Sequence, residues 1–343
     1  MDKLKIEENI DIKPFTTLKL GGKAQFFARI KNSEDLKDAS DFAKAKNLNF
    51  FPLGGGSNIV VGDDISGMLW AKVESKGIEI IKETLSDVYI KVSAGEVWDD
   101  LVDFTVSKGW AGLEALSLIP GTAGATPVQN VGAYGTEVSR VIEEISFFDQ
   151  RKSKTEIMEP SNAMFGYRDS VFKHELKGKA VIESIVFKLS KKDPEIPQYP
   201  SVLETVEEIL KSENSSLLQS IRNAIIKIRK SKLPDPNILP SVGSFFGNPI
   251  ISKDDFERLK LQYPDIKFFE ATNGFKIPAG WLIQKAGLKG YRIGNVGTSP
   301  DHALVLVNYG TDSTKELLDF AFMIQDNIYS KFGIRLEIEP EIV

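Results

Sequence analysis

The chain contains no cysteine and only two histidines among its 343 residues. Without cysteine there can be no disulfide, no thiolate-ligated zinc or iron–sulfur cluster, and no thiolate nucleophile. The two histidines, His174 and His302, leave little material for a metal centre or a Ser-His-Asp triad. We therefore expect no metal site.

Long hydrophobic runs are also missing. No uninterrupted apolar run reaches the roughly 18 residues that indicate a membrane-spanning helix, and the opening MDKLKIEE has no apolar core of a signal peptide. The 43 Lys and Arg against 48 Asp and Glu give a formal net charge of −5, which disfavours non-specific binding to nucleic acid or anionic membranes. We expect a cytoplasmic protein that binds neither, with room for a local basic pocket for a phosphorylated small molecule.

The composition predicts a folded protein of mixed helix and strand. Hydrophobic residues make up 42% and charged residues 27%, as in ordinary globular proteins, and the length allows two domains or three small ones. In the first 110 residues, helices are expected over 34–47, with Ser33 as N-cap, and over about 97–108. Short β-like runs lie between them, several separated by glycine, at 50–53, 59–61, 68–70, 78–81 and 88–92. This order is typical of an α+β fold.

The second half of the chain continues this mixture. A strand is expected over 180–189, and a helix is expected to start at Ser201, with Glu204 closing a capping box. The other expected elements are helices near 216–231, 252–262, 278–287 and 314–331, and strands at 303–307 and 335–338. Proline-rich stretches at 191–200 and 233–240 place a domain boundary somewhere within 191–240.

Two glycine-rich segments are candidate ligand-binding loops. Gly54–Asn58 reads GGGSN between two strand-like runs, where exposed backbone N–H groups can cradle a phosphate or pyrophosphate. It matches neither the dinucleotide fingerprint nor the P-loop, so a tight hairpin turn is the ordinary alternative. The second segment, 111–135, is too apolar for a solvated linker and too rich in glycine for a helix, and we favour a ligand-facing loop over a packed structural one.

Four residues outside these loops have both an ordinary and a functional interpretation. Arg168, beside an aspartate in FGYRDS, forms an ion pair or meets a carboxylate or enolate. Arg229 ends a helix, where the dipole alone favours a cation, or binds phosphate or flavin. Ser244, in GSFFGNP, is no esterase nucleophile without a partner histidine, but its hydroxyl can donate a proton to a carbanion. Glu341, in the terminal EPE, is by default part of a solvated tail.

Taken together and in this order, the segments resemble one family, the UDP-N-acetylenolpyruvoylglucosamine reductases (MurB), over about residues 14–341. The resemblance is carried by TLKLGG (17–22), LGGGSN (53–58), GLEALSLIPGTAGA (112–125), PVQNVGAYG (127–135), FGYRDS (165–170), GSFFGNP (243–249) and EPE (339–341). A tyrosine-bearing loop around Tyr199 makes the chain similar to the longer, first type of the family.

This resemblance implies an α+β fold with a two-lobed FAD-binding domain of the PCMH or vanillyl-alcohol-oxidase-like kind and a C-terminal α+β substrate-binding domain. The expected divisions are lobe 1 at 1–74 with 333–343, lobe 2 at 75–211 and the substrate domain at 212–332. It implies non-covalent FAD with NADPH as co-substrate. The implied FAD contacts are Gly54, Gly55, Gly56, Ser57, Asn58, Ser117, Pro120, Gly121, Gly124, Gln129, Asn130, Gly132, Ala133, Tyr134 and Arg229.

The resemblance also implies the reaction, which is reduction of UDP-N-acetylglucosamine enolpyruvate to UDP-N-acetylmuramate in peptidoglycan precursor synthesis. A hydride reaches C3 of the enolpyruvyl group and a proton reaches C2. Arg168 and Glu341 would stabilise the enolate-like state and Ser244 would donate the proton. The implied substrate-binding residues are Tyr199, Lys232, Asn248 and His302, and a monomer is the expected state.

Three features depart from the family pattern. The chain stops two residues after Glu341, His302 stands where the longer type can have Gln, and Tyr199 is followed by Pro200. Two other functions stay open at this point. One is an oxidase of the same flavin fold acting on another alcohol or sugar, and the other is a nucleotide-sugar-binding protein without catalysis.

Overall fold

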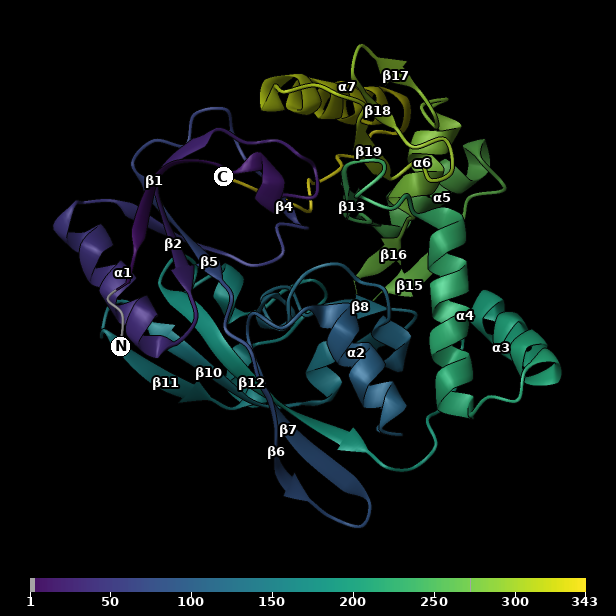
Figure 1. Ribbon diagram of the computed structural model, residues 1–343. Helices are drawn as coiled ribbons and strands as arrows, with labels where there is room; N and C mark the ends of the chain where they lie inside the picture. Colours follow the sequence, from purple (N-terminus) through teal and green to yellow (C-terminus); the bar gives the residue numbers. More distant parts are fainter. Residues whose placement is uncertain (1–3, 272) are drawn as a thin grey trace. The chain divides into compact units, whose positions relative to one another are not determined.

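The structure is a computed structural model that describes residues 4–271 and 273–343 (Figure 1). Residues 1–3 and Thr272 lie outside the described residues. The first three belong to the N-terminal stretch in which no signal peptide is expected. The chain divides into two compact units, each built from separate pieces of sequence. Unit 1 takes the residues up to 10, then 24–55 and 66–231, and unit 2 takes 11–23, 56–65 and 232–343. The predicted three-part division has other boundaries than these two units and stays a prediction.

Unit 1 holds, wholly or almost wholly, two larger sheets, one short hairpin and four helices. The sheets have the strand orders β1-β2-β5-β3 and β11-β10-β12-β7-β6, and β8 pairs with β9. The strands are β1 (Ile6–Asp11), β2 (Lys23–Ile30), β3 (Asn49–Leu53), β5 (Met68–Val73), β6 (Ile78–Glu83), β7 (Asp87–Ser93), β8 (Gly132–Ala133), β9 (Thr136–Glu137), β10 (Ile142–Asp149), β11 (Lys154–Met158) and β12 (Ala180–Ser190). The helices are α1 (Ser33–Ala45), α2 (Trp98–Ser107), α3 (Pro200–Ser212) and α4 (Leu217–Lys232).

The core of unit 1 joins side chains of both its larger sheets with those of α1 and α2. Figure 1 shows β12 between β10 and β7 in the five-stranded sheet. Trp98 of α2 is fully buried, and its ring meets that of Phe187 on β12 edge to face, with ring centroids 6.0 Å apart. Burying two such aromatic side chains contributes several kcal/mol, at roughly 25 cal/mol per Å² of apolar surface. The helix is thereby held on the sheet, which positions the loops attached to it.

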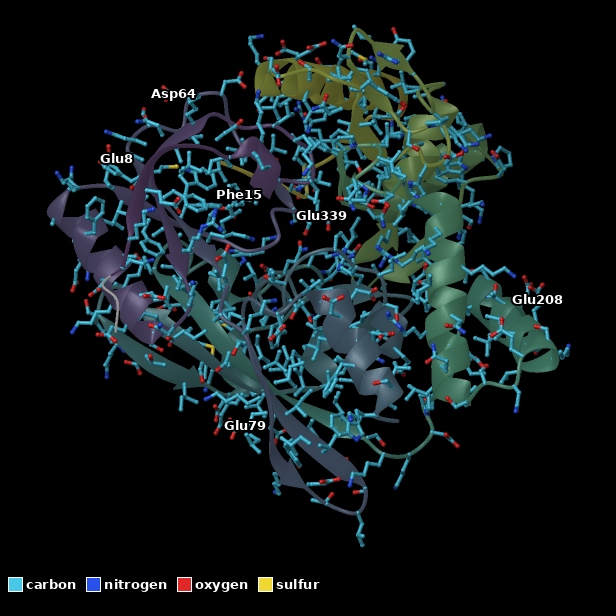
Figure 2. All side chains as sticks on the ribbon, viewed as in Figure 1. Glu8, Phe15, Asp64, Glu79, Glu208 and Glu339 are labelled. Carbon is cyan, nitrogen blue, oxygen red and sulfur yellow. The ribbon has the colours of Figure 1, made fainter. Side chains whose placement is uncertain are left out.

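Helices α3 and α4 form a separate hydrophobic cluster of unit 1. Their contacting side chains are aliphatic and mostly spaced by three or four residues, so that they share one face of each helix. These side chains are Val202, Val206, Ile209, Ile221, Ala224, Ile225 and Ile228. Glu208, labelled in Figure 2, lies on α3, and its carboxylate is 3.1 Å from Nζ of Lys227 on α4. Tyr134 of the glycine-rich loop packs against this cluster, so the helix pair supports that loop.

Unit 2 combines short strands with three helices around its own core. Its sheets have the orders β13-β19-β18-β17, β14-β16-β15 and β20-β4. The strands are β4 (Ile59–Val60), β13 (Ser241–Ser244), β14 (Ile250–Ile251), β15 (Phe269–Ala271), β16 (Gly274–Lys276), β17 (Arg292–Ile293), β18 (Val296–Thr298), β19 (Val305–Asn308) and β20 (Glu341–Ile342). The helices are α5 (Lys253–Gln262), α6 (Ala279–Lys285) and α7 (Thr314–Phe332). Leu18 and Leu20, from the N-terminal piece, are fully buried in this core.

Every helix expected from the sequence is present, with its ends shifted by at most a few residues. The predicted N-cap of α1 was wrong, because Asn32 is extended and its side chain accepts a hydrogen bond of 2.9 Å from the backbone N–H of Asp35. The predicted capping box at Ser201 was also wrong. Helix α3 starts one residue earlier, with Pro200 at its first position and no side-chain cap, where proline is well tolerated.

The expected strand at 335–338 is not formed. This stretch makes an isolated bridge between Ile338 and Phe246, and the strand β20 lies further on, at Glu341–Ile342. No helix or strand was expected between residues 140 and 158, although β10 and β11 occupy most of this stretch.

A buried carboxylate holds the turn between β10 and β11. Asp149 is 1% exposed and accepts hydrogen bonds from Nε and Nη2 of Arg151 at 3.0 and 2.7 Å. The Arg151 guanidinium lowers the pKa of Asp149 to about 2. We expect Asp149→Asn to lower the melting temperature at pH 7.

The pH dependence gives the check on this prediction. A carboxyl with a depressed pKa adds stability above its unfolded value of ~3.9, and this contribution is lost as the pH falls through the folded value. Thermal unfolding of the two proteins should therefore differ most near neutral pH and converge towards pH 2. A constant difference over that range would contradict the assignment.

Candidate flavin and nucleotide-sugar site

The first glycines of the GGGSN segment pack directly on other backbone. A Cβ added at Gly55 would lie 2.6 Å from Cα of Gly121, and one at Gly54 would lie 2.8 Å from Oγ1 of Thr122. Any side chain at either position would push these two loops apart. Gly54, Gly55 and the 121–122 stretch all belong to unit 1, so these parts of the two loops form one surface there.

The same segment then crosses into unit 2 at Gly56, whose φ is +62°. A Cβ at Gly56 would clash with the backbone carbonyl of Phe15, and the carbonyl of Gly56 accepts a 3.0 Å hydrogen bond from the N–H of Thr17. The TLKLGG stretch, which sequence analysis assigned no role, therefore acts as the support for this turn. The hairpin-turn alternative does not hold, because the flanking strands β3 and β4 do not pair with each other.

Helix α2 positions the long loop through three hydrogen bonds near its N-terminus. Nε1 of Trp98 donates to the carbonyl of Leu116 at 2.9 Å, and the Trp98 backbone N–H donates to the carbonyl of Gly121 at 3.1 Å. Asp99 accepts from the N–H of Leu118 at 2.6 Å. Leu118 has φ +58°, a left-handed conformation that costs a non-glycine residue energy, and this hydrogen bond stabilises it.

Sequence analysis missed the residue that secures Asp99. Arg222 on α4 is 5% exposed and donates to Asp99 at 2.8 Å and to Asp103 at 3.1 Å. A buried guanidinium in a fork with two carboxylates is a strong and directional contact. It links α4 to α2 and, through Asp99, to the loop at Leu118.

Arg168 lies at the tip of a tight turn that is fastened to the long loop. Gly166 and Asp169 pair through backbone hydrogen bonds of 3.0 and 3.3 Å, and Arg168 has φ +56°. The side-chain amide of Asn130 donates to the carbonyl of Gly166 at 3.0 Å, while Ser170 donates to the carbonyl of Val128 at 2.6 Å. Hydrogen bonds at residues before and after Arg168 thus support its left-handed backbone conformation. Asp169 pairs with His174 at 2.7 Å.

The side chain of Asn130, which was expected to contact the cofactor, forms its hydrogen bonds within the protein. Asn130 is 1% exposed, donates to Glu137 and Gly166, and accepts from the N–H of Ser139 at 3.2 Å. Its φ of +43° matches the tolerance of asparagine for left-handed backbone. We infer that Asn130 acts by shaping the loop.

Arg229 and Arg168 form a positively charged region with Tyr134. Burial lowers the pKa of Arg229, Tyr134 and Asp99 oppose this shift, and the nearby Arg168 adds to it. Nε of Arg229 is buried and has no hydrogen-bond partner among the described residues. Burial raises the pKa of Tyr134, and Arg229 opposes the shift. The helix-dipole explanation for Arg229 is therefore insufficient, because the guanidinium is drawn into a buried, polar environment.

Tyr199 packs on the same loop. Its ring centroid is 5.8 Å from that of Tyr134 in an edge-to-face arrangement, and its side chain is 40% exposed. A Cβ added at Gly135 would lie 3.7 Å from Cε2 of Tyr199. Tyr199 is thus next to Tyr134 and, through it, near Arg229, all within unit 1.

In unit 2, Ser244 ends β13 directly after Gly243, which has φ +74°. Its neighbours Phe245 and Phe246 are fully buried, and the N–H of Phe245 donates to the carbonyl of Leu304 at 2.9 Å. The two phenylalanines anchor the backbone directly after Ser244, so the position of the serine is well defined.

The C-terminal segment is built into unit 2 and is not a solvated tail. The N–H of Glu341 donates to the carbonyl of Asn58 at 3.0 Å, and β20 pairs in parallel with β4. The N–H of Glu339 (Figure 2) donates to the carbonyl of Phe245 at 3.0 Å. Although the chain stops two residues later, the backbone of Glu341 is fixed and is linked to both the Asn58 and the Ser244 segments.

The remaining substrate-binding candidates also belong to unit 2. Oδ1 of Asn248 accepts a 2.9 Å hydrogen bond from the N–H of Ala279 at the start of α6, so its amide group is oriented. Lys232, at the end of α4, is exposed. Burial lowers the pKa of His302, and Lys232 and Lys289 lower it further. His302 and Lys232 are therefore close enough to interact electrostatically.

Lys72 is a further polar residue that the motif search missed. It lies on β5 and is partly buried, which lowers its pKa, and its Nζ donates to the carbonyl of Gly54. A lysine inside the otherwise apolar strand MLWAKV was the signal in the sequence. Its charge lies at the first glycine of the phosphate loop, where an anion would be stabilised.

Known proteins resemble this chain along its whole length. Residues 235–343 match the UDP-N-acetylenolpyruvoylglucosamine reductase C-terminal domain, and residues 24–151 match an FAD binding domain. The UDP-N-acetylenolpyruvoylglucosamine reductase of Flavobacterium johnsoniae is 39% identical over 343 residues, covering 99% of this chain and all of the relative. This chain belongs to that family. The corresponding reductase of Pseudomonas syringae pv. tomato is 36% identical, with 99% of each chain covered.

A solved structure shows the same fold in this reductase family. The MurB structure from Thermus caldophilus matches with a TM-score of 0.68 at 24% identity, covering 99% of this chain and 98% of the other. The expected family, α+β fold class and FAD cofactor are confirmed. No helix among the described residues is both long and apolar enough to cross a membrane.

The reductase residues expected at FAD fall into both units. Gly54, Gly55, Ser117, Pro120, Gly121, Gly124, Gln129, Asn130, Gly132, Ala133, Tyr134 and Arg229 lie in unit 1, and Gly56, Ser57 and Asn58 lie in unit 2. The glycine surface free of side chains and the buried, unpartnered Nε of Arg229 fit a ligand with a pyrophosphate and a polar ring. Ser117 is fully buried and donates to the carbonyl of Glu114 at 2.6 Å, so its hydroxyl serves the loop.

The first prediction for this site concerns Lys72. Replacement by methionine removes the cation and its hydrogen bond to the phosphate loop. A hydrogen bond to a charged group contributes about 1.5–3 kcal/mol, so we expect the dissociation constant of FAD from the apoprotein to rise roughly tenfold or more. Lys76→Met, which removes an exposed lysine paired with Glu96, is the control and should bind FAD as the wild type does. Equal affinities for both variants would refute the assignment.

The second prediction concerns His302. Its folded pKa lies below 6.5, so the unfolded chain takes up the proton first as the pH falls. Its contribution to stability is therefore complete above pH ~6.5 and is lost as the pH drops towards the folded value. We expect the melting temperature of the ligand-free wild type to fall more steeply between pH 7 and 5.5 than that of His302→Gln. Identical slopes would show that the imidazole is not desolvated.

Proposed function

We propose that this chain is an FAD-dependent oxidoreductase that reduces UDP-N-acetylglucosamine enolpyruvate to UDP-N-acetylmuramate with NADPH, in peptidoglycan precursor synthesis. The observation that carries the proposal is full-length similarity to reductases of that name. The cationic region of Arg168 and Arg229 on an FAD-binding domain supports it. FAD is bound non-covalently, since the chain has no cysteine and neither histidine lies in the glycine-rich loops.

Bound FAD supplies the redox step, accepting a hydride from NADPH and delivering it to C3 of the enolpyruvyl group. The backbone of Gly54–Asn58 would hold the pyrophosphate, and the 117–135 loop would line the flavin. Arg229 would supply a cation near the pyrimidine edge of the flavin, where it would favour the anionic reduced form. Its buried, unpartnered Nε is the donor available for that contact.

Arg168 stabilises the negative charge that develops during the reaction. Addition at C3 moves charge onto C2 and the adjoining carboxylate, and a preorganised guanidinium lowers the energy of that state without reorganising. The clamp formed by Asn130 and Ser170 provides this preorganisation. The strained backbone of Arg168 is consistent with a residue held for function.

Ser244 donates the proton to C2. Its hydroxyl oxygen carries the charge left behind and is reprotonated from solvent or a neighbouring group before the next turnover. Glu341 acts beside it, either protonated or by orienting the substrate carboxylate through hydrogen bonds. Their backbone segments lie in one unit and are linked through Phe245, Glu339 and β20.

Lys232 and Asn248 hold the diphosphate of the UDP group, with the lysine supplying charge and the asparagine amide a directed N–H donor. His302 contributes a neutral imidazole close to Lys232. Tyr199 closes over the nucleotide from its place beside Tyr134. The protein works as a cytoplasmic monomer that needs no nucleic acid or membrane.

One spectroscopic experiment tests the reaction as a whole. The purified protein should show a flavin spectrum that bleaches with NADPH under anaerobic conditions and returns on addition of UDP-N-acetylglucosamine enolpyruvate. Bleaching without reoxidation by this substrate would leave an oxidase-like flavoprotein with another substrate. If no flavin bound even after reconstitution with FAD, a nucleotide-sugar-binding protein would remain.

The role of Ser244 has its own test. We expect Ser244→Ala to slow reoxidation of the reduced flavin by substrate about 10²-fold or more, while reduction by NADPH keeps its wild-type rate. Stopped-flow absorbance separates these two half-reactions. Ser241→Ala is the matched control, since Ser241 lies on the same strand but is 3% exposed. Wild-type reoxidation in the Ser244 variant would assign the proton donor elsewhere.

A further inference from the structure

Glu183 is a buried carboxylate to which the proposed reaction gives no role. It lies on β12 in unit 1, and both of its carboxylate oxygens are buried without a hydrogen-bond partner among the described residues. An ionised carboxylate is purely an acceptor, and removing it from water without donors costs several kcal/mol. Such a group calls for a partner outside the polypeptide, such as a ligand, an ion or a water.

The backbone at Glu183 is irregular in a way that singles out this residue. On β10, Ser146 pairs with Ser184, whereas the next residue, Phe147, pairs with Ile182. Glu183 is therefore the extra residue of a β-bulge, a feature that re-aims a side chain and is common beside functional sites. The side chain of a glutamate at this bulge therefore does not have to follow the regular alternation of side chains between the two faces of the sheet.

Glu183 is also connected to the cofactor loop through one intermediate residue. Its carbonyl accepts a 2.9 Å hydrogen bond from the N–H of Ala94, and the carbonyl of Ala94 accepts one of 2.9 Å from the N–H of Gly124. A Cβ at Gly124 would lie 2.5 Å from Cβ of Ala94. Gly124 lies in the short helix η3 (Ala123–Ala125), which also approaches Gly54 through Ala125.

The chemistry of FAD restricts which part a carboxylate can meet. The pyrophosphate is anionic and has only acceptors, so it would repel Glu183. Donors are found in the adenine amino group and ribose hydroxyls on one side of the pyrophosphate, and in the ribityl hydroxyls and flavin ring N–H on the other. The flavin side is assigned to the region of Arg229 and Tyr134, whereas Glu183 is linked through Ala94 to η3 beside Gly54, in the loop assigned to the pyrophosphate.

We propose that the Glu183 carboxylate binds the adenosine half of FAD, accepting hydrogen bonds from its ribose hydroxyls or adenine amino group. Glu183 is then a residue that selects the dinucleotide FAD over a flavin mononucleotide. The proposal depends on FAD being the cofactor, as the proposed function states.

The test compares two flavins on the apoprotein. FMN carries the flavin ring, the ribityl chain and one phosphate but no adenosine. For Glu183→Leu, we expect the dissociation constant of FAD, measured by flavin fluorescence, to rise about tenfold or more, and that of FMN to stay within about twofold of the wild-type value. Glu183→Gln, which keeps one acceptor oxygen, should show a smaller loss for FAD alone. Glu143→Ala, which removes an exposed glutamate of β10, is the control.

The melting temperature of the apoprotein distinguishes ligand binding from a structural role, because the two roles predict opposite changes when Glu183 is replaced. Because Glu183→Leu removes a buried charge without a partner, the melting temperature of the apoprotein should hold or rise, while the stabilisation conferred by added FAD should shrink. A lower melting temperature with unchanged FAD affinity would show that the carboxylate serves the local fold or a buried water. Equal losses for FAD and FMN would place its partner in the flavin half, and failure of the wild type to bind FAD would refute the cofactor itself.

Discussion

Close packing at glycines that leave no room for a side chain is the constraint on which the candidate cofactor loops of unit 1 depend. Gly54 and Gly55 meet Gly121 and Thr122, and Gly124 meets Ala94, at distances that no side chain would allow. This close packing brings a row of peptide groups to one surface, and peptide N–H groups are suitable ligands for a pyrophosphate. The conformational freedom lost by so many glycines has to be offset elsewhere.

The compensation comes from hydrogen bonds between the loops and the regular elements. Trp98 and Asp99 of α2 hold the 116–121 stretch, and Asn130 and Ser170 join the same loop to the turn that carries Arg168. Each of these contacts uses a buried polar group that is satisfied inside the protein. The loop therefore has a defined shape before any ligand arrives, which reduces the entropy lost on binding.

Two other polar groups, both proposed to meet the cofactor, are left unsatisfied by the protein. Nε of Arg229 and the Glu183 carboxylate are buried without partners among the described residues. Replacing such groups by apolar ones commonly stabilises a protein, so their presence reflects function at the cost of stability. Asn130 and Arg229, both expected from the family pattern to contact FAD, therefore differ in structure, since the Asn130 side chain is hydrogen-bonded within the protein and Nε of Arg229 has no partner among the described residues.

The sequence was most informative where local chemistry decides the structure. Helices α2, α5 and α7 follow from amphipathic spacing and end signals, and the glycine-rich loops could be recognised from composition alone. Elements that depend on distant partners were harder to predict. The β20–β4 pair joins two-residue strands from opposite ends of the chain, and no local pattern marks so short a pairing. The β10–β11 hairpin was overlooked because its strands mix buried and charged residues.

The residues of the candidate site also differ in whether a local sequence pattern marks them. Arg168, Ser244 and Glu341 were proposed because their motifs match a family, whereas Arg222 carries no motif and the sequence does not show that Ser170, within FGYRDS, holds the Val128 carbonyl. The partners of Ser170 and Arg222 lie 42 and about 120 positions away in the sequence. Lys72 and Glu183 could have been noticed as charges within apolar strands, but strand sequences alone do not distinguish a charge facing solvent from one that is buried.

The composition of unit 2 from three separate pieces has a consequence for the order of folding during synthesis. Asn308 donates to the carbonyl of Leu18, 290 positions earlier, and Val343 pairs with Val60 and Gly62. Most of unit 1 is complete once residue 231 has left the ribosome, whereas Leu18 and Leu20 must wait for the final third of the chain to cover them. The nascent protein thus carries exposed apolar segments for most of its translation, and a chaperone that binds such segments would find its target near the N-terminus.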